Sequence, residues 1–190
     1  MVTDYYHLSM SVEEYLAFDR ASLDARYEYI DGIVTMLAGG VAKHSIICIN
    51  ICGQLDAALQ DQSCLVFNSD IRVSISPTRY VYPDISVSCD PSDQEQDNID
   101  NIQHPCLVIE VLSPTTESYD RNKKFSYYRD CPTVQEYVMV STQEQAVDLY
   151  RRASDKLWAL HLFRPGDVIE LRSIGVSIPI SAIYKKVKFS

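Results

Sequence analysis

The stretch HPCLVIEVLSP, from His104 to Pro114, has the pattern of a β-strand that is apolar at both its odd and its even positions. Strands with other elements packed on both faces show this pattern, because neither face meets solvent. The stretch therefore predicts the central strand of a sheet that is covered on both sides. Glu110 lies in its middle, where a carboxylate is costly unless it is paired or takes up a proton.

A second stretch, YVYPDISVSCD, predicts a strand with Pro83 and Asp84 at its start, where proline is tolerated. If the two strands are neighbours, Asp84 and Glu110 lie close together at one edge of the sheet. Two carboxylates about 5 Å apart repel each other by about 3 kcal/mol at an effective dielectric constant of about 20. A shared proton, a basic residue or a divalent cation would offset this repulsion. Hard oxygen ligands of this kind suit magnesium or manganese.

The N-terminal part of the chain predicts a helix, a hairpin and a longer helix. The first helix begins in SVEEYLAFD, where Ser11 and Glu14 form a capping box. The segment RYEYIDGIVTML predicts a hairpin with a type I′ turn at Asp31 and Gly32. Residues 41–62 predict the longest helix, because apolar side chains recur in it at every fourth position: Ile47, Ile51, Leu55 and Leu59.

The remainder of the chain predicts further strands and two more helices. Short β-rich runs occupy residues 63–70, 71–76, 134–141, 145–152, 156–163 and 167–173. A helix is predicted at 116–131, where Pro132 ends it, and a short one after Pro179. Helices and strands are mixed without strict βαβ alternation. This order predicts an α/β (α+β) fold, with a mixed central β-sheet flanked by helices and an N-terminal helix and hairpin.

The bulk properties indicate one globular domain, residues 1–190, with 46% hydrophobic and 23% charged residues. No apolar run reaches the roughly 18 residues that a membrane-spanning helix needs. The first residues, MVTDYYHLSM, lack the pattern of a secretory signal, so we expect a cytoplasmic protein without membrane contact. A net charge of −9 disfavours a broad, non-specific nucleic-acid surface but leaves room for a local cleft.

The cysteines and the acidic loop predict no metal site of their own. Six cysteines are scattered through the chain without a C-x-x-C motif, which favours buried free thiols over a zinc site or a disulfide framework. The segment DPSDQEQDNIDN, residues 90–101, lacks the glycine and the terminal glutamate of a calcium loop, so we expect a solvated loop. The histidines form neither H-x-H nor H-E-x-x-H, which makes zinc hydrolysis an unfavoured mechanism.

Two further charged residues are candidates for the same site. Asp120, Lys124 and Tyr128 are spaced by four residues and share a helix face. Lys124 either forms a surface pair with Asp120 or projects a cation back over the strand ends, where it would orient a water or meet phosphate charge. Glu28 shares a strand face with Ile30, and the alternative for it is a partly exposed strand residue.

These residues stand in an ordered set that resembles a known family. The set is YEYIDG, SDIRV, YPDISV, VIEVLSPTTESYDRNKKFSYYRD, VQEYVMV and VDLYRR, from about Tyr27 to about Arg152. It resembles the Uma-two family, restriction-endonuclease-like proteins of the PD-(D/E)XK nuclease superfamily. The most specific part is EVLSP followed by D-x-x-x-K-F-x-x-Y. The resemblance implies a restriction-endonuclease-like fold.

The resemblance also implies roles for individual residues. Asp84 matches the acid of the PD half-motif, and Glu110 matches the acid of the (D/E)XK half-motif. Leu112 stands where the superfamily has its lysine, and Lys124 on the following helix matches the place to which this family moves it. Glu28 matches an additional N-terminal acid. Three residues are expected to bind substrate or to support the site: His44, Arg72 and Tyr128.

The function that the resemblance implies is metal-dependent endonuclease activity on a nucleic acid, expected to be DNA. Asp84, Glu110 and the backbone carbonyl of Val111 are expected to hold Mg²⁺ or Mn²⁺, and Glu28 either completes that shell or helps to hold a second ion. A homodimer is expected if both strands of a duplex are cut. Two alternatives stay open: a nuclease-like binding or assembly module with little turnover, and a metal-dependent enzyme for another substrate. A basic rim around the acids would favour the nuclease.

Overall fold

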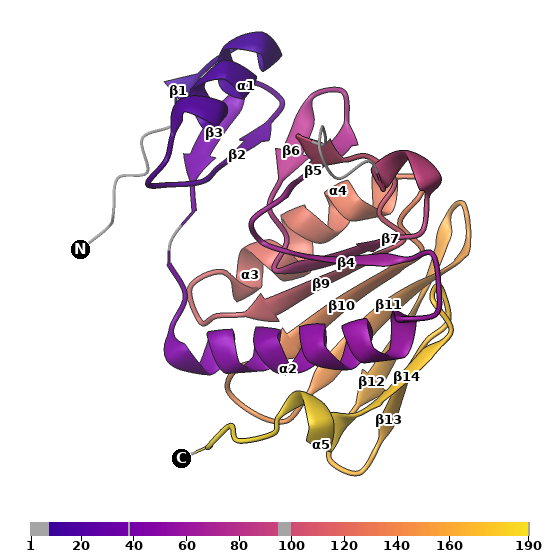
Figure 1. Ribbon diagram of the computed structural model, residues 1–190. Coiled ribbons are helices and arrows are strands. Elements are labelled where there is room, and N and C mark those ends of the chain that lie inside the picture. The colour runs from indigo at the N-terminus through magenta and orange to yellow at the C-terminus, as the bar shows by residue number, and fades with distance from the viewer. Residues whose placement is uncertain (1–7, 38, 95–99, 190) are drawn as a thin grey trace.

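The computed structural model describes residues 8–37, 39–94 and 100–189. Within these residues the strands form two six-stranded sheets and one separate hairpin (Figure 1). The N-terminal sheet has, in spatial order, β1 (Leu8–Ser9), β3 (Ile33–Met36), β2 (Tyr27–Ile30), β6 (Arg79–Val81), β5 (Arg72–Ser76) and β8 (Asn101–Ile102). The main sheet has β12 (Leu157–Phe163), β11 (Val147–Ser154), β10 (Glu136–Ser141), β9 (Leu107–Leu112), β7 (Ile85–Ser88) and β4 (Leu65–Asn68). The hairpin pairs β13 (Val168–Leu171) with β14 (Val176–Pro179).

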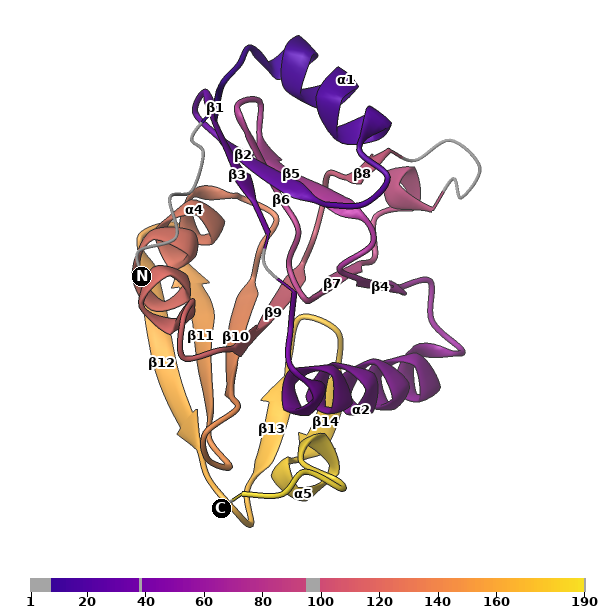
Figure 2. The same cartoon turned by 90° about the vertical axis from the view of Figure 1, so that its left-hand side faces the viewer.

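Strand β9 is a central strand with both faces buried, as predicted. It pairs antiparallel with β7 and parallel with β10, so the main sheet is mixed. Its odd-numbered residues, such as Ile109, belong to the apolar core that also contains α2 (Ala42–Leu59) and α5 (Ile180–Ile183). Val108 and Leu112 belong to a second core on the other face, with α4. Figure 2 shows the main sheet between α4 on one side and α2, β13 and β14 on the other.

The predicted N-terminal elements are confirmed. Helix α1 (Val12–Ala21) begins at a complete capping box of Ser11 and Glu14. The turn between β2 and β3 has positive φ at both central residues, 49° at Asp31 and 98° at Gly32, as a type I′ turn requires. The four apolar residues of the α2 stripe are all buried against the main sheet.

The expected single strand at Tyr80–Cys89 is divided between the two sheets. Strand β6 ends at Val81 in the N-terminal sheet, and β7 begins at Ile85 in the main sheet. Pro83 lies between them, and a proline without an N–H cannot continue a hydrogen-bonded ladder. The chain therefore changes sheets just before Asp84. The structure therefore has two sheets where we expected one central sheet, and the chain passes from one to the other between β6 and β7.

The helix expected at 116–131 is confirmed but is not uniform. It consists of α3 (Glu117–Tyr119), a π-helical turn (Asp120–Lys124) and α4 (Phe125–Asp130). The wider turn changes the angular spacing of side chains, and such turns often occur at functional sites. Asp120 and Lys124 are both buried in it, so the alternative of a surface pair is wrong.

The structure corrects the predictions about the cysteines and the acidic loop at three residues, Cys64, Cys89 and Asp93, whereas Cys48, Cys52, Cys106 and Cys131 are free thiols as expected. Cys64 and Cys89 form a disulfide between the segment before β4 and the end of β7. The antiparallel pairing of β4 with β7 brings these residues together, although they are 25 positions apart in the chain. Asp93, in the short 3₁₀ turn Pro91–Asp93, is buried and accepts hydrogen bonds from Ser88 and from the backbone of His104. The rest of the acidic loop, 95–99, lies outside the described residues.

None of the helices in the described ranges is long and apolar enough to cross a membrane.

Candidate active site

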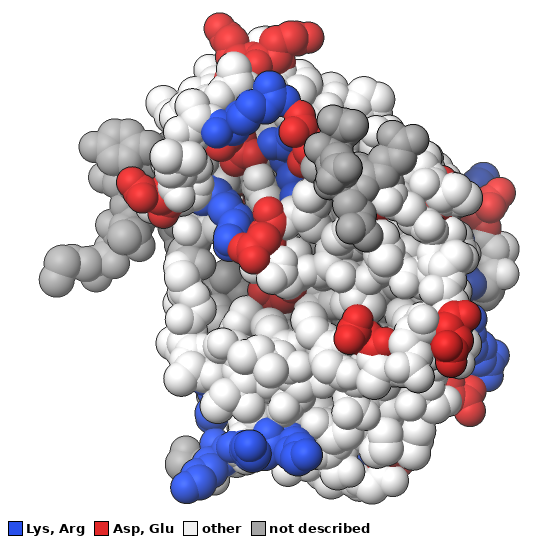
Figure 3. All heavy atoms as spheres, in the orientation of Figure 1, with Lys and Arg blue, Asp and Glu red and all other residues white. Residues whose placement is uncertain are grey.

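A cleft of about 1250 Å³ opens between α2, the start of β7, the end of β9 and the turn that leads into α3. Asp84, Glu110, Lys124 and His44 all line it. Figure 3 shows it as a hollow with acidic atoms at its floor. The structure therefore brings four of the candidate residues to one open surface.

Asp84 and Glu110 meet because of the register between β7 and β9. Ile85 lies opposite Ile109 in this antiparallel pair, so the preceding Asp84 lies at the level of Glu110. The side chain of Asp84 turns toward β9, and its Oδ2 accepts a hydrogen bond of 2.7 Å from the backbone N–H of Val111. The condition on which Asp84 and Glu110 were expected to lie close together, that their strands are neighbours, is met.

Lys124 joins the two glutamates of the cluster. Its Nζ lies 2.9 Å from Oε1 of Glu110 and 3.0 Å from Oε1 of Glu28. All three residues are buried, with exposed fractions of 4–5%. Lys124 and Glu110 line the cleft, while Glu28 reaches the lysine from strand β2 of the N-terminal sheet. The structure thus places Glu28 inside the cluster rather than in the alternative, partly exposed position.

The remaining hydrogen bonds of the glutamates come from two tyrosine residues. The hydroxyl of Tyr128 donates to Oε1 of Glu110 over 2.8 Å, so Tyr128 contacts the acid and not the lysine that we expected it to support. The backbone N–H of Tyr82 donates to Oε1 of Glu28 over 3.3 Å. Tyr82 directly precedes Pro83, and nothing in the sequence pattern marked it.

The pKa values of Glu110 and Lys124 are both raised, with opposite effects on their charges. Burial raises the pKa of Glu110 to about 8, with Asp84 and Asp120 adding to the shift and Lys124 opposing it. Burial acts to lower the pKa of Lys124, but Glu110 and Glu28 outweigh it and hold that pKa well above its usual value. Lys124 therefore keeps its positive charge, while the carboxyl group of Glu110 is mostly protonated near neutral pH. Burial also raises the pKa of Asp120, which lines the same cleft.

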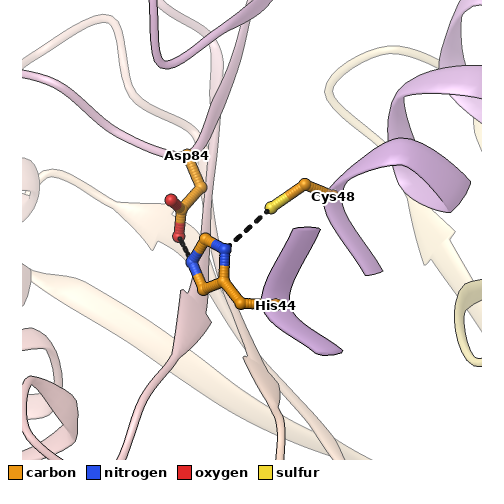
Figure 4. A group of neighbouring side chains, drawn as sticks. All are labelled: His44, Cys48 and Asp84. Atoms are coloured by element: carbon orange, nitrogen blue, oxygen red, sulfur yellow. Dashed lines mark hydrogen bonds and ion pairs between the residues drawn. The ribbon is translucent and has the colours of Figure 1, made fainter. Parts of the chain in front are cut away.

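His44 and Cys48 extend the cluster onto α2. Figure 4 shows the imidazole of His44 between the two other side chains. Its Nε2 lies 3.1 Å from Oδ2 of Asp84, and its Nδ1 lies 3.6 Å from Sγ of Cys48. The hydrogen bond to Asp84 raises the pKa of His44 despite partial burial. Burial raises the pKa of the Cys48 thiol, and the nearby Asp84 adds to the effect, which disfavours a free thiolate. We had not singled out Cys48, although its spacing of four residues from His44 was a visible signal.

Arg72 lies outside this cluster. Its guanidinium forms a buried ion pair with Asp19 of α1, and it lies over the rings of Tyr15 and Tyr80. The hydroxyl of Tyr82 donates to the same carboxylate over 2.6 Å. Among the described residues, Arg72 is connected to the site through Tyr82, whose backbone N–H donates to Glu28.

The donor set fits a hard divalent ion. In the described part of the chain, Asp84 makes its contacts through Oδ2 and Glu110 makes its contacts through Oε1. Oδ1 of Asp84 and Oε2 of Glu110 are therefore the oxygens left for an ion at the cleft floor. Carboxylate oxygens are the ligands that magnesium and manganese prefer. A nitrogen donor of His44 and the sulfur of Cys48 also lie within 4.8 Å of an oxygen of Asp84.

Comparisons with known proteins bear on the family and the fold. Residues 12–181 match the model of the Uma2 family, described as "Putative restriction endonuclease". A relative from Synechocystis sp., the uncharacterized protein slr1290, is 38% identical over 185 residues, covering 95% of this chain and 94% of that protein. A second, sll1609 of the same organism, is 29% identical over 152 residues, covering 80% and 85% of the two chains. The crystal structure of a putative nuclease of DUF820 from Anabaena variabilis has a TM-score of 0.76 at 21% identity. It covers 94% of this chain and 99% of that one. This likeness confirms the expected restriction-endonuclease-like fold.

Proposed function

Because this chain belongs to the Uma2 family, we propose that it is a metal-dependent endonuclease that hydrolyses phosphodiester bonds in DNA. The observation that carries the proposal is the position of Asp84 opposite Glu110 at the floor of an open cleft, with Lys124 beside them. Two acids and a lysine on adjoining elements are the groups that such hydrolysis requires.

The acids would hold the ion. Asp84, Glu110 and the carbonyl of Val111 are the proposed ligands for Mg²⁺ or Mn²⁺. Glu28 would complete the shell or help to hold a second ion once Lys124 releases it. A bound ion of this kind lowers the pKa of a coordinated water and polarises the phosphate.

Lys124 would supply the positive charge that the reaction needs at a fixed place. Its raised pKa keeps it protonated, and the two glutamates hold its ammonium group at the cleft wall. From there it would donate to the attacking water or to a phosphate oxygen as negative charge develops. Tyr128 would act as a positioning residue, because its hydroxyl orients Glu110. His44, which donates to Asp84, would either orient that acid or meet substrate.

The charge around the cleft limits how a nucleic acid would bind. The cleft is lined by two basic residues, Arg26 and Lys124, and by five acids: Asp56, Asp70, Asp84, Glu110 and Asp120. Arg26 is itself paired with Asp70. The basic rim that would favour a nuclease is therefore not present in the described lining, and metal ions would have to offset much of the repulsion from phosphate.

A basic group beside the cleft offers a phosphate contact. Lys43, in the first turn of α2, lies with its Nζ 5.1 Å from the ring centre of Phe189. This contact places it next to the C-terminal lysines, Lys185, Lys186 and Lys188. Figure 3 shows a basic group near the C-terminus, below the hollow. A DNA strand that crosses the start of α2 would meet both this group and the cleft.

The first test separates metal binding from cleavage. We would melt the protein with and without manganese, beside Asp84→Asn and Glu110→Gln. Manganese at about 100 times its dissociation constant should add about 2.7 kcal/mol of stability. For a chain of this size that is a shift of about 5–10 °C. Asp56→Asn, which changes an exposed acid of the same cleft, should keep the shift. A wild-type protein without a shift, or a shift that both site variants keep, would contradict the proposal.

Cleavage is then measured on plasmid DNA, linear duplex and single-stranded RNA with manganese. Wild-type protein should cut DNA, and Asp84→Asn and Lys124→Met should lower the rate by at least about 100-fold. A metal shift without cleavage of any substrate would favour the alternative, a nuclease-like binding or assembly module.

Two further parts of the proposal concern the state of the protein. Cutting both strands of a duplex takes two active sites, so we propose a homodimer, which sedimentation at several protein concentrations would test. We also propose a cytoplasmic location. A reducing compartment would tend to open the Cys64–Cys89 disulfide, so labelling of free thiols in cells tests this part directly.

A further inference from the structure

His44, Cys48 and Asp84 form a mixed set of donors at the wall of the cleft. Each offers one possible ligand atom, and these atoms all lie within 4.8 Å of one another. His44 and Cys48 are one helical turn apart on α2, so the helix holds the imidazole and the thiol on one face. Asp84 enters from the start of β7, a separate element. The arrangement therefore consists of two possible ligands from one helix, His44 and Cys48, and one carboxylate, Asp84, from the start of a strand.

We propose that His44, Cys48 and Asp84 form a binding site for a thiophilic divalent cation, of which Zn²⁺ is the representative. Imidazole and thiolate ligands favour zinc and its neighbours over magnesium, which prefers oxygen alone. In a tetrahedral zinc site, nitrogen, oxygen and sulfur ligands lie about 3.4–3.6 Å from one another, as follows from the usual bond lengths. In the structure, Asp84 Oδ2 lies 3.1 Å from Nε2 of His44 and Cys48 Sγ lies 3.6 Å from Nδ1, so the two partners contact opposite nitrogens of the ring. The three donor atoms lie within 4.8 Å of one another and would move closer to reach the spacing of a metal shell.

Binding of the ion to one ring nitrogen of His44 would replace the contact that this nitrogen now makes, with either Asp84 or Cys48. Only one nitrogen of an imidazole can serve the same ion, so the His44 side chain would turn until Nε2 or Nδ1 faces both Cys48 and Asp84. Binding would release to solvent the thiol proton of Cys48 and any proton on the ring nitrogen that becomes the ligand. Three protein ligands leave the fourth position of a tetrahedral site open. All three residues line the cleft, so water or a substrate can reach that position.

The backbone beside His44 makes room for this ring. A Cβ atom on Gly40 would come within 3.1 Å of Nδ1 of His44, which is tighter than nine in ten contacts of this kind. A residue with a side chain at position 40 would therefore require the imidazole to shift by a few tenths of an ångström.

The shared carboxylate links this site to the proposed nuclease centre. Asp84 is also a proposed ligand of the hard ion, so an Asp84 held by zinc would be less available to magnesium or manganese. This consequence rests on the proposed function, whereas the zinc site itself does not. Zinc would then act as an antagonist of the hard ion at the same cleft.

Cobalt(II) is the probe for the site, because it takes zinc positions and its absorption reports its ligands. We would titrate the wild-type protein, with its Cys64–Cys89 disulfide intact, with Co²⁺ and record the near-ultraviolet charge-transfer band of a thiolate–cobalt bond. Cys48→Ser removes the proposed sulfur ligand. Cys52→Ser is the matched control, because Cys52 lies one turn further along α2 and also lines the cleft. His44→Gln tests the nitrogen ligand.

The expected result is one equivalent of Co²⁺ with a thiolate band in the wild type and in Cys52→Ser. Zn²⁺ should displace the cobalt. Cys48→Ser should lose the band, and His44→Gln should bind Co²⁺ at least about tenfold more weakly. Absence of a band in the wild type, a band that persists in Cys48→Ser, or a band lost in Cys52→Ser would each overturn the proposal. Circular dichroism of every variant checks that it is folded.

Competition between zinc and manganese for the cleft is measured by binding and does not require DNA cleavage. Manganese bound to protein loses its sharp electron paramagnetic resonance signal, and zinc should restore that signal in the wild type. In Cys48→Ser, at least about tenfold more zinc should be needed. Glu110→Gln should lose manganese binding but keep the cobalt–thiolate band. A wild type with the cobalt band but no bound manganese would leave the zinc site standing while the proposed function fails.

Discussion

The ammonium group of Lys124 lies 2.9 Å from Oε1 of Glu110, on the strand that precedes its own helix. The same group reaches Glu28 on the other sheet. One buried lysine thus connects the main sheet, the N-terminal sheet and the helix behind them. Its positive charge offsets the repulsion between the two glutamates when no metal ion is bound, so the site can fold without an ion.

Lys124→Met should destabilise the protein more at pH 8 than at pH 5. The change leaves Glu28 and Glu110 buried without their cation, and breaking a buried ion pair costs about 3–5 kcal/mol. At lower pH the glutamates can take up protons, which reduces this cost. Urea unfolding at both pH values measures the difference. Lys123→Met, at the exposed neighbouring position, should change stability by less than about 0.5 kcal/mol.

The stability of the wild-type protein should fall between about pH 4.5 and pH 8. The pKa of Glu110 is raised from 4.5 to about 8, so in this window the folded state binds more protons than the unfolded state. Stability then decreases as pH rises, by at most about 1.4 kcal/mol per pH unit for one proton. Above pH 8 this contribution is constant.

Glu110→Gln should have a flatter pH profile of unfolding free energy across that window. Glu144→Gln, which changes an exposed glutamate, should keep the wild-type slope. Equal slopes in wild type and Glu110→Gln would mean that Glu110 does not carry the raised pKa. The raised pKa of Lys124 does not interfere, because it affects stability only above about pH 10.5.

Tyr128→Phe and Tyr137→Phe should differ in their effect on metal binding. Both side chains are fully buried, but Tyr128 donates to the carboxylate of Glu110, whereas Tyr137 donates to the backbone carbonyl of Asp120. Above about pH 8, where Glu110 is ionised, loss of the bond to this charged acceptor should cost about 1.5–3 kcal/mol, and loss of the neutral one about 1 kcal/mol. Only Tyr128→Phe should also weaken manganese binding in a calorimetric titration. Equal weakening by both would point to a general loss of packing.

Arg72→Met should lower stability without changing manganese affinity. It leaves the buried carboxylate of Asp19 without its cation, for a loss of about 3–5 kcal/mol. The double variant Asp19→Leu/Arg72→Met should recover much of this loss, because neither charge then remains buried. A folded Arg72→Met protein that no longer binds manganese would instead place Arg72 in the metal site.

Several features followed from local sequence. The apolar run of β9, the stripe of α2, the capping box at Ser11 and the turn at Asp31 each depend on residues within a few positions of one another. The adjacency of Asp84 and Glu110 was expected only if their strands are neighbours, and the segment between β7 and β9 includes a 3₁₀ turn and strand β8 of the other sheet. The roles expected for Lys124 and Glu28 depended on the family resemblance.

Other features were not visible in the sequence. The disulfide between Cys64 and Cys89, the burial of Asp93 and the division of one expected strand between two sheets were all missed. Cys48 was missed as a partner of His44, because a cysteine in an apolar helix is most simply read as core. Each of these features depends on which distant strand or helix packs against the residue.

The sequence by itself determined which segments form strands and helices and which acids stand at strand ends, because side-chain periodicity and turn chemistry act between near neighbours in the chain. The tertiary structure decided that Glu28 shares Lys124 with Glu110 and that His44 meets Asp84. These contacts join segments far apart in the chain. Their formation depends on strand register and on the packing of both faces of the main sheet, which no local pattern encodes.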